Sequence, residues 1–309
     1  MSRWSAADIP DQTGRTVLVT GATSGLGLRT AAVLARRGAT VLMTCRDPKR
    51  GREAWERLLF DSDGVGATLV LLDLADLASV RKAASRVREL TGDRLDVLVN
   101  NAGVMATPAR LTVDGFELQI ATNHLGHAAL TWLLAPALTP GARVITVSSL
   151  AHRSGGLDVN DLNFDRRRYH PTTAYSASKL ANLLFTFELD RRARAACRNL
   201  LAVAAHPGFT DTDLIANSAR MHSAGPFAHV VRWGTKLVTQ SVARGVLPQL
   251  YAATAPDVRS GEYFGPAGLG ETRGPPSRVT PSPAARDELT AHLLWERTAE
   301  LTGVTPDPA

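Results

Sequence analysis

Cysteine is scarce in this chain of 309 residues, and long apolar runs are absent from it. Its two cysteines, Cys45 and Cys197, stand in no C-x-x-C or other metal-ligand pattern. We therefore expect no disulfide framework and a reducing, cytoplasmic setting. No run approaches the ~18 consecutive apolar residues of a membrane-spanning helix. Residues 1–8 lack the apolar core of a secretory signal, so we expect no membrane anchor.

Lysine is scarce as well, because four of the 35 basic residues are lysines and the rest are arginines. With 29 acidic residues the formal net charge is +6, and a basic balance can indicate a nucleic-acid partner. The arginines stand singly or in short clusters without interleaved aromatic residues, so we expect no such partner. No metal site is expected either, since no coherent ligand spacing joins the histidines His124, His127, His152 and His206.

Short apolar runs alternate with helical patterns along most of the chain. The runs typical of buried strands occupy residues 16–20, 40–45, 67–72, 95–100, 143–148 and 200–205. Such strands, alternating with helices, predict βαβ units and a parallel sheet covered on both faces. We expect a single α/β domain over 1–309 with a Rossmann-type, doubly wound, mostly parallel sheet of seven strands. Residues 211–240 break the pattern and predict a substrate flap, and a last helix is expected at about 284–302.

A glycine-rich turn follows the first expected strand and opens the first expected helix. From Thr20 to Gly27 it reads T-G-A-T-S-G-L-G. Glycines at such a turn let the backbone approach a pyrophosphate at the N-terminus of a helix. The spacing is G-x-x-x-G-x-G, so its position between strand and helix is the stronger signal. We expect cofactor contacts from Gly21, Thr23, Ser24, Gly25, Leu26 and Gly27.

The residues after the second expected strand bear on the choice of dinucleotide. An NAD site places an acidic residue there to hold the ribose 2′-hydroxyl. An arginine instead presents a rigid fork of donors that suits a 2′-phosphate. The order here is Cys45-Arg46-Asp47, with arginine at the strand tip. We therefore expect NADP(H), with Arg46 as a ligand, while the neighbouring Asp47 leaves NAD(H) open.

Tyr175 and Lys179 are four residues apart in a helical pattern, which places them on one face of a helix. A phenol ionises near pH ~10, and a neighbouring ammonium group favours the phenolate and so lowers that pKa. A tyrosine adjusted in this way can exchange a proton with a substrate near neutral pH. The spacing alone is common, but beside a dinucleotide-binding turn it predicts a catalytic proton donor.

Together these motifs resemble the classical short-chain dehydrogenase/reductases over about residues 15–265, with features of the NADP-preferring retinol-dehydrogenase-like and protochlorophyllide-reductase-like group. The resemblance implies a catalytic set in which one residue binds a relay water, one binds the substrate oxygen, one exchanges the proton and one binds the ribose: Asn123, Ser149, Tyr175 and Lys179. It also implies cofactor contacts after the third, fourth and sixth strands, from Asp73, Leu74, Asn101, Ala102, Gly103, Pro207, Gly208, Thr210 and Thr212.

What the resemblance implies about activity is hydride transfer between NADP(H) and a carbonyl or alcohol. Two alternatives stay open: reduction of a C=C bond, and a regulator that binds NADP without turnover. Apolar residues within 211–240 suggest a lipophilic or aromatic small-molecule substrate. Family members often assemble through the tyrosine-bearing helix, so a homodimer or homotetramer is expected, with Phe185, Phe187 and Leu189 as contact or core residues.

Overall fold

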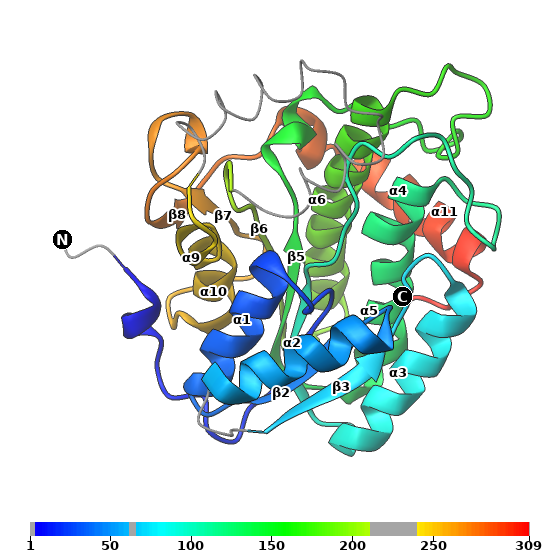
Figure 1. Cartoon of the computed structure of the whole chain (residues 1–309). Helices are drawn as coiled ribbons and strands as arrows, with labels where there is room; N and C mark the ends of the chain where they lie inside the picture. The colour runs from blue at the N-terminus through cyan, green and yellow to red at the C-terminus, as the bar shows by residue number, and fades with distance from the viewer. Residues whose placement is uncertain (1–3, 62–65, 211–239, 309) are drawn as a thin grey trace, which may run out of the picture.

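A computed structural model describes residues 4–61, 66–210 and 240–308. These residues form one eight-stranded sheet with helices on both faces (Figure 1), in the order β3-β2-β1-β4-β5-β6-β7-β8. The strands are β1 (Thr16–Val19), β2 (Thr40–Cys45), β3 (Ala67–Leu71), β4 (Leu95–Asn100), β5 (Leu138–Val147), β6 (Leu200–Ala205), β7 (Tyr263–Pro266) and β8 (Pro276–Arg278).

The first seven strands all pair in parallel, and β8 pairs with β7 in the antiparallel direction. The expected doubly wound, mostly parallel sheet is confirmed, and β8 is an eighth strand that we did not predict. It has three residues and contains Pro276, which has no N–H to donate, so it suits the edge of a sheet. So short a strand leaves no alternating pattern in the sequence.

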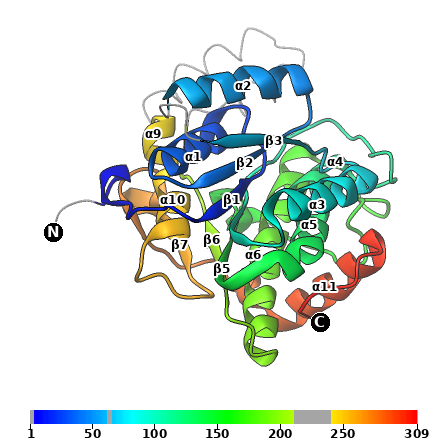
Figure 2. The same ribbon diagram turned by 90° about the horizontal axis from the view of Figure 1, so that it is seen from below.

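Helices cover both faces of the sheet (Figures 1 and 2). One face carries α1 (Gly25–Arg36), α2 (Pro48–Asp61), α9 (Val242–Gly245) and α10 (Leu247–Thr254). The other carries α3 (Leu77–Thr91), α5 (Gly126–Leu134), α6 (Pro171–Ala195) and α11 (Glu288–Thr302). The chain crosses from one face to the other between β3 and β4, and ligands of such sheets bind outside the carboxyl ends of the strands at this switch point.

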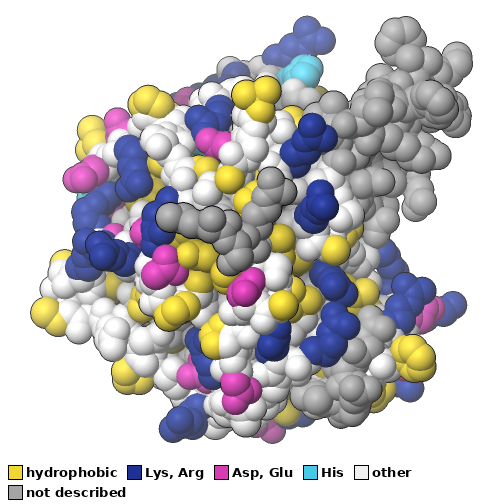
Figure 3. Space-filling view, turned by 90° about the vertical axis from the view of Figure 1, so that its left-hand side faces the viewer, with side chains coloured by type: hydrophobic (Ala, Val, Ile, Leu, Met, Phe, Trp, Pro, Cys, Tyr) yellow, Lys and Arg dark blue, Asp and Glu magenta, His cyan; other side chains and the backbone are white. Residues whose placement is uncertain are grey.

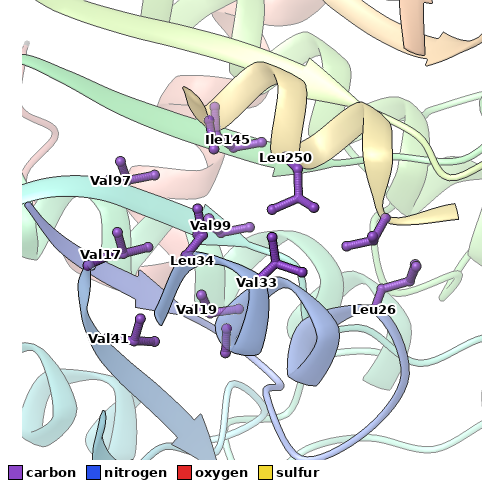
Figure 4. Packing of buried hydrophobic residues seen from close by; sticks show 14 of the residues in the cluster. Val17, Val19, Leu26, Val33, Leu34, Val41, Val97, Val99, Ile145 and Leu250 are labelled. Carbon is purple, nitrogen blue, oxygen red and sulfur yellow. The ribbon is translucent and has the colours of Figure 1, made fainter. Parts of the chain in front are cut away.

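Side chains of the central strands alternate between the two faces, as a period of two requires. Val17 and Val19 of β1 pack with Leu34 of α1 and Leu250 of α10 (Figure 4), whereas Leu18 packs in the cluster on the opposite face. Both faces are therefore buried. This explains why the strands read as continuous apolar runs in the sequence.

Three expected boundaries differ from the structure. The helix expected over about 113–134 begins as α4 (Leu118–Ile120), passes through a π-helical turn (Ala121–Leu125) and continues as α5. The strand expected at 143 begins earlier, at Leu138. The last helix begins at Glu288, because Asp287 accepts the Thr290 N–H and caps it. Of the expected flap over 211–240, residues 211–239 lie outside the described residues.

The C-terminal helix α11 packs along α6 and α5 and buries the side chains expected at an intersubunit contact. Phe185 stacks on Trp295 of α11, with ring centroids 5.3 Å apart. The guanidinium of Arg286 lies 4.0 Å above the Phe187 ring, and Leu189 is buried. These three residues of α6 therefore belong to the core of the described chain.

Candidate active site

The glycine turn brings its backbone as close to neighbouring segments as a side chain would forbid. Gly21 has φ +65°, and a Cβ there would lie 2.9 Å from the Ala102 Cα. A Cβ on Gly27 would overlap the Gly21 carbonyl oxygen. Ser24 is the N-cap of α1, but its side chain makes no capping hydrogen bond. The first N–H groups of α1 and the Ser24 hydroxyl thus fit a pyrophosphate.

Thr20 connects the glycine turn to the segment after β4. Its Oγ1 accepts the Asn101 N–H at 2.9 Å and the Ala102 N–H at 3.0 Å, while Asn101 Nδ2 donates to the Thr20 carbonyl at 2.8 Å. The predicted cofactor residues Asn101 and Ala102 therefore border the glycine turn directly. We did not predict that Thr20 would hold these two segments together, although its place before Gly21 could have indicated it.

Arg46 and Asp47 lie at the carboxyl end of β2 and have different environments. Asp47 Oδ1 accepts the N–H groups of Lys49 and Arg50 at 2.8 and 3.3 Å, so this carboxylate caps α2. Arg46 is exposed, and within the described part of the chain its guanidinium has no hydrogen-bond or ion-pair partner. An exposed guanidinium beside a carboxylate that already caps a helix fits a 2′-phosphate.

Asp73 and Leu74 follow β3, at the same edge of the sheet. Asp73 Oδ1 accepts the Ala75 N–H at 2.9 Å, and its own N–H donates to Ser79 Oγ at 2.9 Å. Leu74 is buried against α5, where a Cβ on Gly126 would overlap the Leu74 carbonyl. Packing and turn geometry thus fix this segment between the end of β3 and α5.

Ser149 and Tyr175 come together at the carboxyl end of β5. Ser149 follows this strand, while Tyr175 lies in the second turn of α6 and is half-buried. Burial raises the pKa of Tyr175, and a hydrogen bond with the Ser149 side chain acts in the opposite direction. Two hydroxyl groups so placed can both bind one substrate oxygen.

Lys179 lies one turn further along α6 and is buried, with 4 % of its surface exposed. Its Nζ lies 5.8 Å from the Tyr175 ring centre and donates to the Val147 carbonyl at 3.1 Å. Burial lowers the pKa of Lys179 to about 8. A Cβ on Gly103 would lie 3.5 Å from Nζ and 3.0 Å from Asn123 Oδ1, so these groups adjoin.

The side-chain amide of Asn123 makes three hydrogen bonds to protein partners. Its Oδ1 accepts the Val104 N–H at 2.8 Å, and Nδ2 donates to the Val104 carbonyl and to Ser178 Oγ, each at 2.9 Å. The amide therefore holds the segment after Gly103, and the backbone carbonyl of Asn123 is an acceptor that a relay water could bind.

His127 binds that carbonyl, which the sequence did not reveal. Its Nδ1 lies 3.1 Å from the Asn123 carbonyl oxygen, and its Nε2 lies 2.9 Å from Thr20 Oγ1. A carbonyl only accepts, so Nδ1 carries the hydrogen and Nε2 is the acceptor. Burial lowers the pKa of His127 to about 4, which keeps the ring neutral at pH 7.

The Pro-Gly segment follows β6 at the same edge. Thr210 Oγ1 donates to the Pro207 carbonyl at 2.8 Å, and Gly208 has φ +64°. These residues lie where the resemblance implies a contact with the nicotinamide. Thr212 lies outside the described residues.

Other kinds of site find little support in the described ranges. No group of three or more His, Cys, Asp or Glu side chains in them could hold a metal ion, and none of their helices is long and apolar enough to cross a membrane. On the face in Figure 3, basic side chains are spread out with acidic ones among them.

Comparisons with known proteins agree with this geometry. The model of the short chain dehydrogenase family matches residues 15–223. Human retinol dehydrogenase 13 is 39% identical over 97% of this chain and 87% of its own length, and mouse polyprenol dehydrogenase is 38% identical over 96% and 86%.

Solved structures give the same result. A crystal structure of an uncharacterised Mycobacterium paratuberculosis protein has a TM-score of 0.81 at 45% identity and covers 98% of both chains. A short chain dehydrogenase from Burkholderia cenocepacia, solved in complex with NADP, has a TM-score of 0.62 at 27% identity over 82% of this chain and 96% of its own. The chain therefore belongs to the short-chain dehydrogenase family, in its retinol-dehydrogenase-like subgroup.

Proposed function

We propose that this oxidoreductase uses NADP(H) to interconvert a carbonyl and an alcohol, with Tyr175 as the general acid and base. The observation that carries the proposal is that the Tyr175 and Ser149 side chains adjoin at the carboxyl end of β5, with the buried Lys179 one helical turn along α6 from Tyr175. Both hydroxyls can bind one substrate oxygen, which is the geometry that carbonyl reduction needs.

When it is bound, the nicotinamide supplies or accepts the hydride. In reduction, Tyr175 donates its proton to the carbonyl oxygen, and the Ser149 hydroxyl stabilises the negative charge that develops there. The Lys179 ammonium stabilises the phenolate left behind. In oxidation the same phenolate removes the proton of the alcohol. After reduction the phenolate regains its proton from Lys179, and Lys179 regains one from a solvent molecule that the Asn123 carbonyl oxygen, oriented by His127, can bind as an acceptor.

The preference for NADP(H) rests on Arg46. Its guanidinium is exposed and has no partner among the described residues, whereas the Asp47 carboxylate uses Oδ1 to cap α2. A guanidinium and a phosphate form charge-assisted hydrogen bonds that an uncharged ribose cannot match. The similar Burkholderia protein was solved with NADP, which is consistent with this choice.

The substrate that we propose is a lipophilic alcohol or its aldehyde. Retinol and polyprenol, after which two similar proteins are named, are both apolar molecules with a primary hydroxyl group. We also propose a cytoplasmic location, because the buried Cys45 and the exposed Cys197 are both free thiols, as expected in a reducing compartment.

An α,β-unsaturated aldehyde such as cinnamaldehyde separates carbonyl reduction from C=C reduction, because it contains both bonds. The purified protein is incubated with NADPH and cinnamaldehyde or all-trans-retinal, and the products are identified by mass spectrometry. We expect the unsaturated alcohol, because two hydroxyls converge on one oxygen. A saturated aldehyde would favour the enoyl-type alternative. NADPH binding without any turnover would favour the non-catalytic regulator.

A further inference from the structure

His206, the first residue after β6, is 1 % exposed and makes two directed hydrogen bonds. Its Nδ1 lies 3.2 Å from the Gly208 backbone nitrogen, and its Nε2 lies 3.1 Å from Glu271 Oε2. A backbone N–H only donates, so Nδ1 must be the acceptor and Nε2 must carry the ring hydrogen. The tautomer of His206 is therefore fixed, with Nε2–H donating to Glu271.

Glu271 is held in turn by Arg153. Arg153 Nη2 donates to Glu271 Oε1 at 2.7 Å and to the Thr280 carbonyl at 2.9 Å. The hydrogen bond from His206 is the main cause that lowers the pKa of Glu271, so its carboxylate is charged at neutral pH. Arg153 belongs to the short helix Leu150–Ser154, which starts directly after Ser149. The chain Arg153–Glu271–His206 thus connects the segment of the catalytic serine to the end of β6.

The group at the end of this chain is the Pro207–Gly208 turn. Gly208 adopts φ +64°, which directs its N–H back toward His206, and a Cβ there would overlap the Thr272 carbonyl. The Phe209 N–H donates to that Thr272 carbonyl at 2.9 Å. The imidazole ring itself packs so closely on Gly265 that a Cβ at that position would overlap it. The turn therefore depends on His206 for the direction of one peptide group.

We propose that His206, oriented by Glu271 and Arg153, is a positioning residue that fixes the Pro207–Gly208 turn against the nicotinamide end of the cofactor. This inference rests on the proposed function, which puts the nicotinamide at this edge beside Ser149 and Tyr175. The role differs from packing. It requires a hydrogen-bond acceptor at the place of Nδ1, and it acts on the nicotinamide half of the cofactor rather than on the adenosine half.

Two conservative variants separate the two nitrogens. In His206→Asn the amide oxygen can take the place of Nδ1 and accept the Gly208 N–H. In His206→Gln the longer amide takes the place of Nε2 and leaves the Gly208 N–H without its acceptor. Binding of NADPH and of 2′,5′-ADP, which has the adenosine half but no nicotinamide, is measured by fluorescence titration and calorimetry. Thermal denaturation checks that each variant is folded.

We expect His206→Gln to weaken NADPH binding about tenfold, because a buried N–H loses its partner. Binding of 2′,5′-ADP should change less than about twofold in the same variant, and His206→Asn should keep most of the NADPH affinity. Equal losses in the Asn and Gln variants would overturn the proposal, as would equal losses of NADPH and 2′,5′-ADP.

A milder pair of variants covers the case in which His206 does not tolerate replacement. Glu271→Gln weakens the bond that orients the ring, and we expect roughly threefold weaker NADPH binding with unchanged 2′,5′-ADP binding. Glu262→Gln is the matched control, because Glu262 also pairs with an arginine, Arg278, but lies at the amino end of β7 and does not contact His206. Equal NADPH affinities of the Glu271→Gln and Glu262→Gln variants would contradict the proposal.

These binding measurements need no substrate, so the two proposals can fail separately. A wild-type protein that binds NADPH and reduces no carbonyl would contradict the proposed function and still decide the role of His206.

Discussion

Lys179 Nζ lies 5.8 Å from the centre of the Tyr175 ring and donates to the Val147 carbonyl at 3.1 Å, so the ammonium is fixed at the end of β5. Burial raises the pKa of Tyr175 and lowers that of Lys179 to about 8. Near pH 7 the phenol therefore keeps its proton, and the lysine keeps most of its charge. The site is prepared to donate a proton before it has to accept one.

The first prediction concerns pH. We expect kcat/KM for carbonyl reduction to fall as the pH rises through about 8, because Lys179 then loses the charge that stabilises the phenolate. This decrease in kcat/KM reports the titration of Tyr175 and Lys179 as a coupled pair. In Lys179→Arg the side chain stays charged, so we expect the decrease to occur at higher pH and the maximal rate to be lower. A decrease at the same pH in that variant would show that another group causes it.

The second prediction concerns stability. Lys179 has a lower pKa in the folded chain than its ordinary 10.5, so folding places an unfavourable charge in the interior below about pH 8. Stability should therefore increase as the pH rises from about 8 to 10.5, where the unfolded state binds more protons. At pH 7, Lys179→Met should be inactive yet more stable, by on the order of 2 kcal/mol. Urea denaturation at pH 7 and pH 10 tests this, and the gain should shrink at pH 10.

The third prediction concerns Ser149. Replacing it by alanine removes a donor to the developing oxyanion, which should lower kcat for reduction by about 10²–10³-fold. NADPH binding should stay within about twofold, since Ser149 is assigned to the substrate oxygen. Ser154→Ala is the matched control, because this exposed serine ends the same short helix. Similar rates in the two variants would exclude the role assigned to Ser149.

The fourth prediction concerns the choice of cofactor. Arg46→Ala should weaken NADPH binding by about 10–100-fold, as expected for lost charge-assisted hydrogen bonds, and leave NADH binding nearly unchanged. Arg50→Ala provides the control, because Arg50 is also an exposed arginine in the first turn of α2. Equal losses in the two variants, or a wild-type protein that prefers NADH, would refute the assignment to Arg46.

The sequence was sufficient for the parallel strands and the glycine turn, because both leave local patterns. Continuous apolar runs follow from burial on both faces of the sheet, and positions such as Gly21 and Gly27 permit no side chain. Ser149 leaves no pattern of its own in the sequence, and the likeness of the motifs to a known family was needed to place it with Tyr175.

The remaining features depend on contacts between distant residues. The hydrogen bonds that connect Arg153 to His206 pass through Glu271, which is 65 residues away from His206 in the sequence. No local spacing of residues predicts this connection. Asn123 lies in a π-helical turn, and its amide bonds Val104, 19 residues earlier, which no local pattern in the sequence indicates. The coverage of Phe185 by Trp295 likewise required the position of α11.

The most direct test of the account is Tyr175→Phe, assayed for NADPH binding and for aldehyde reduction in the same preparation. Loss of the general acid should lower kcat for all-trans-retinal or cinnamaldehyde by about 10²–10⁴-fold. The Kd for NADPH should stay within about twofold of wild type, because the ring remains and only the hydroxyl is lost. A variant that binds NADPH and retains the wild-type rate would contradict the assignment of Tyr175 as the proton donor.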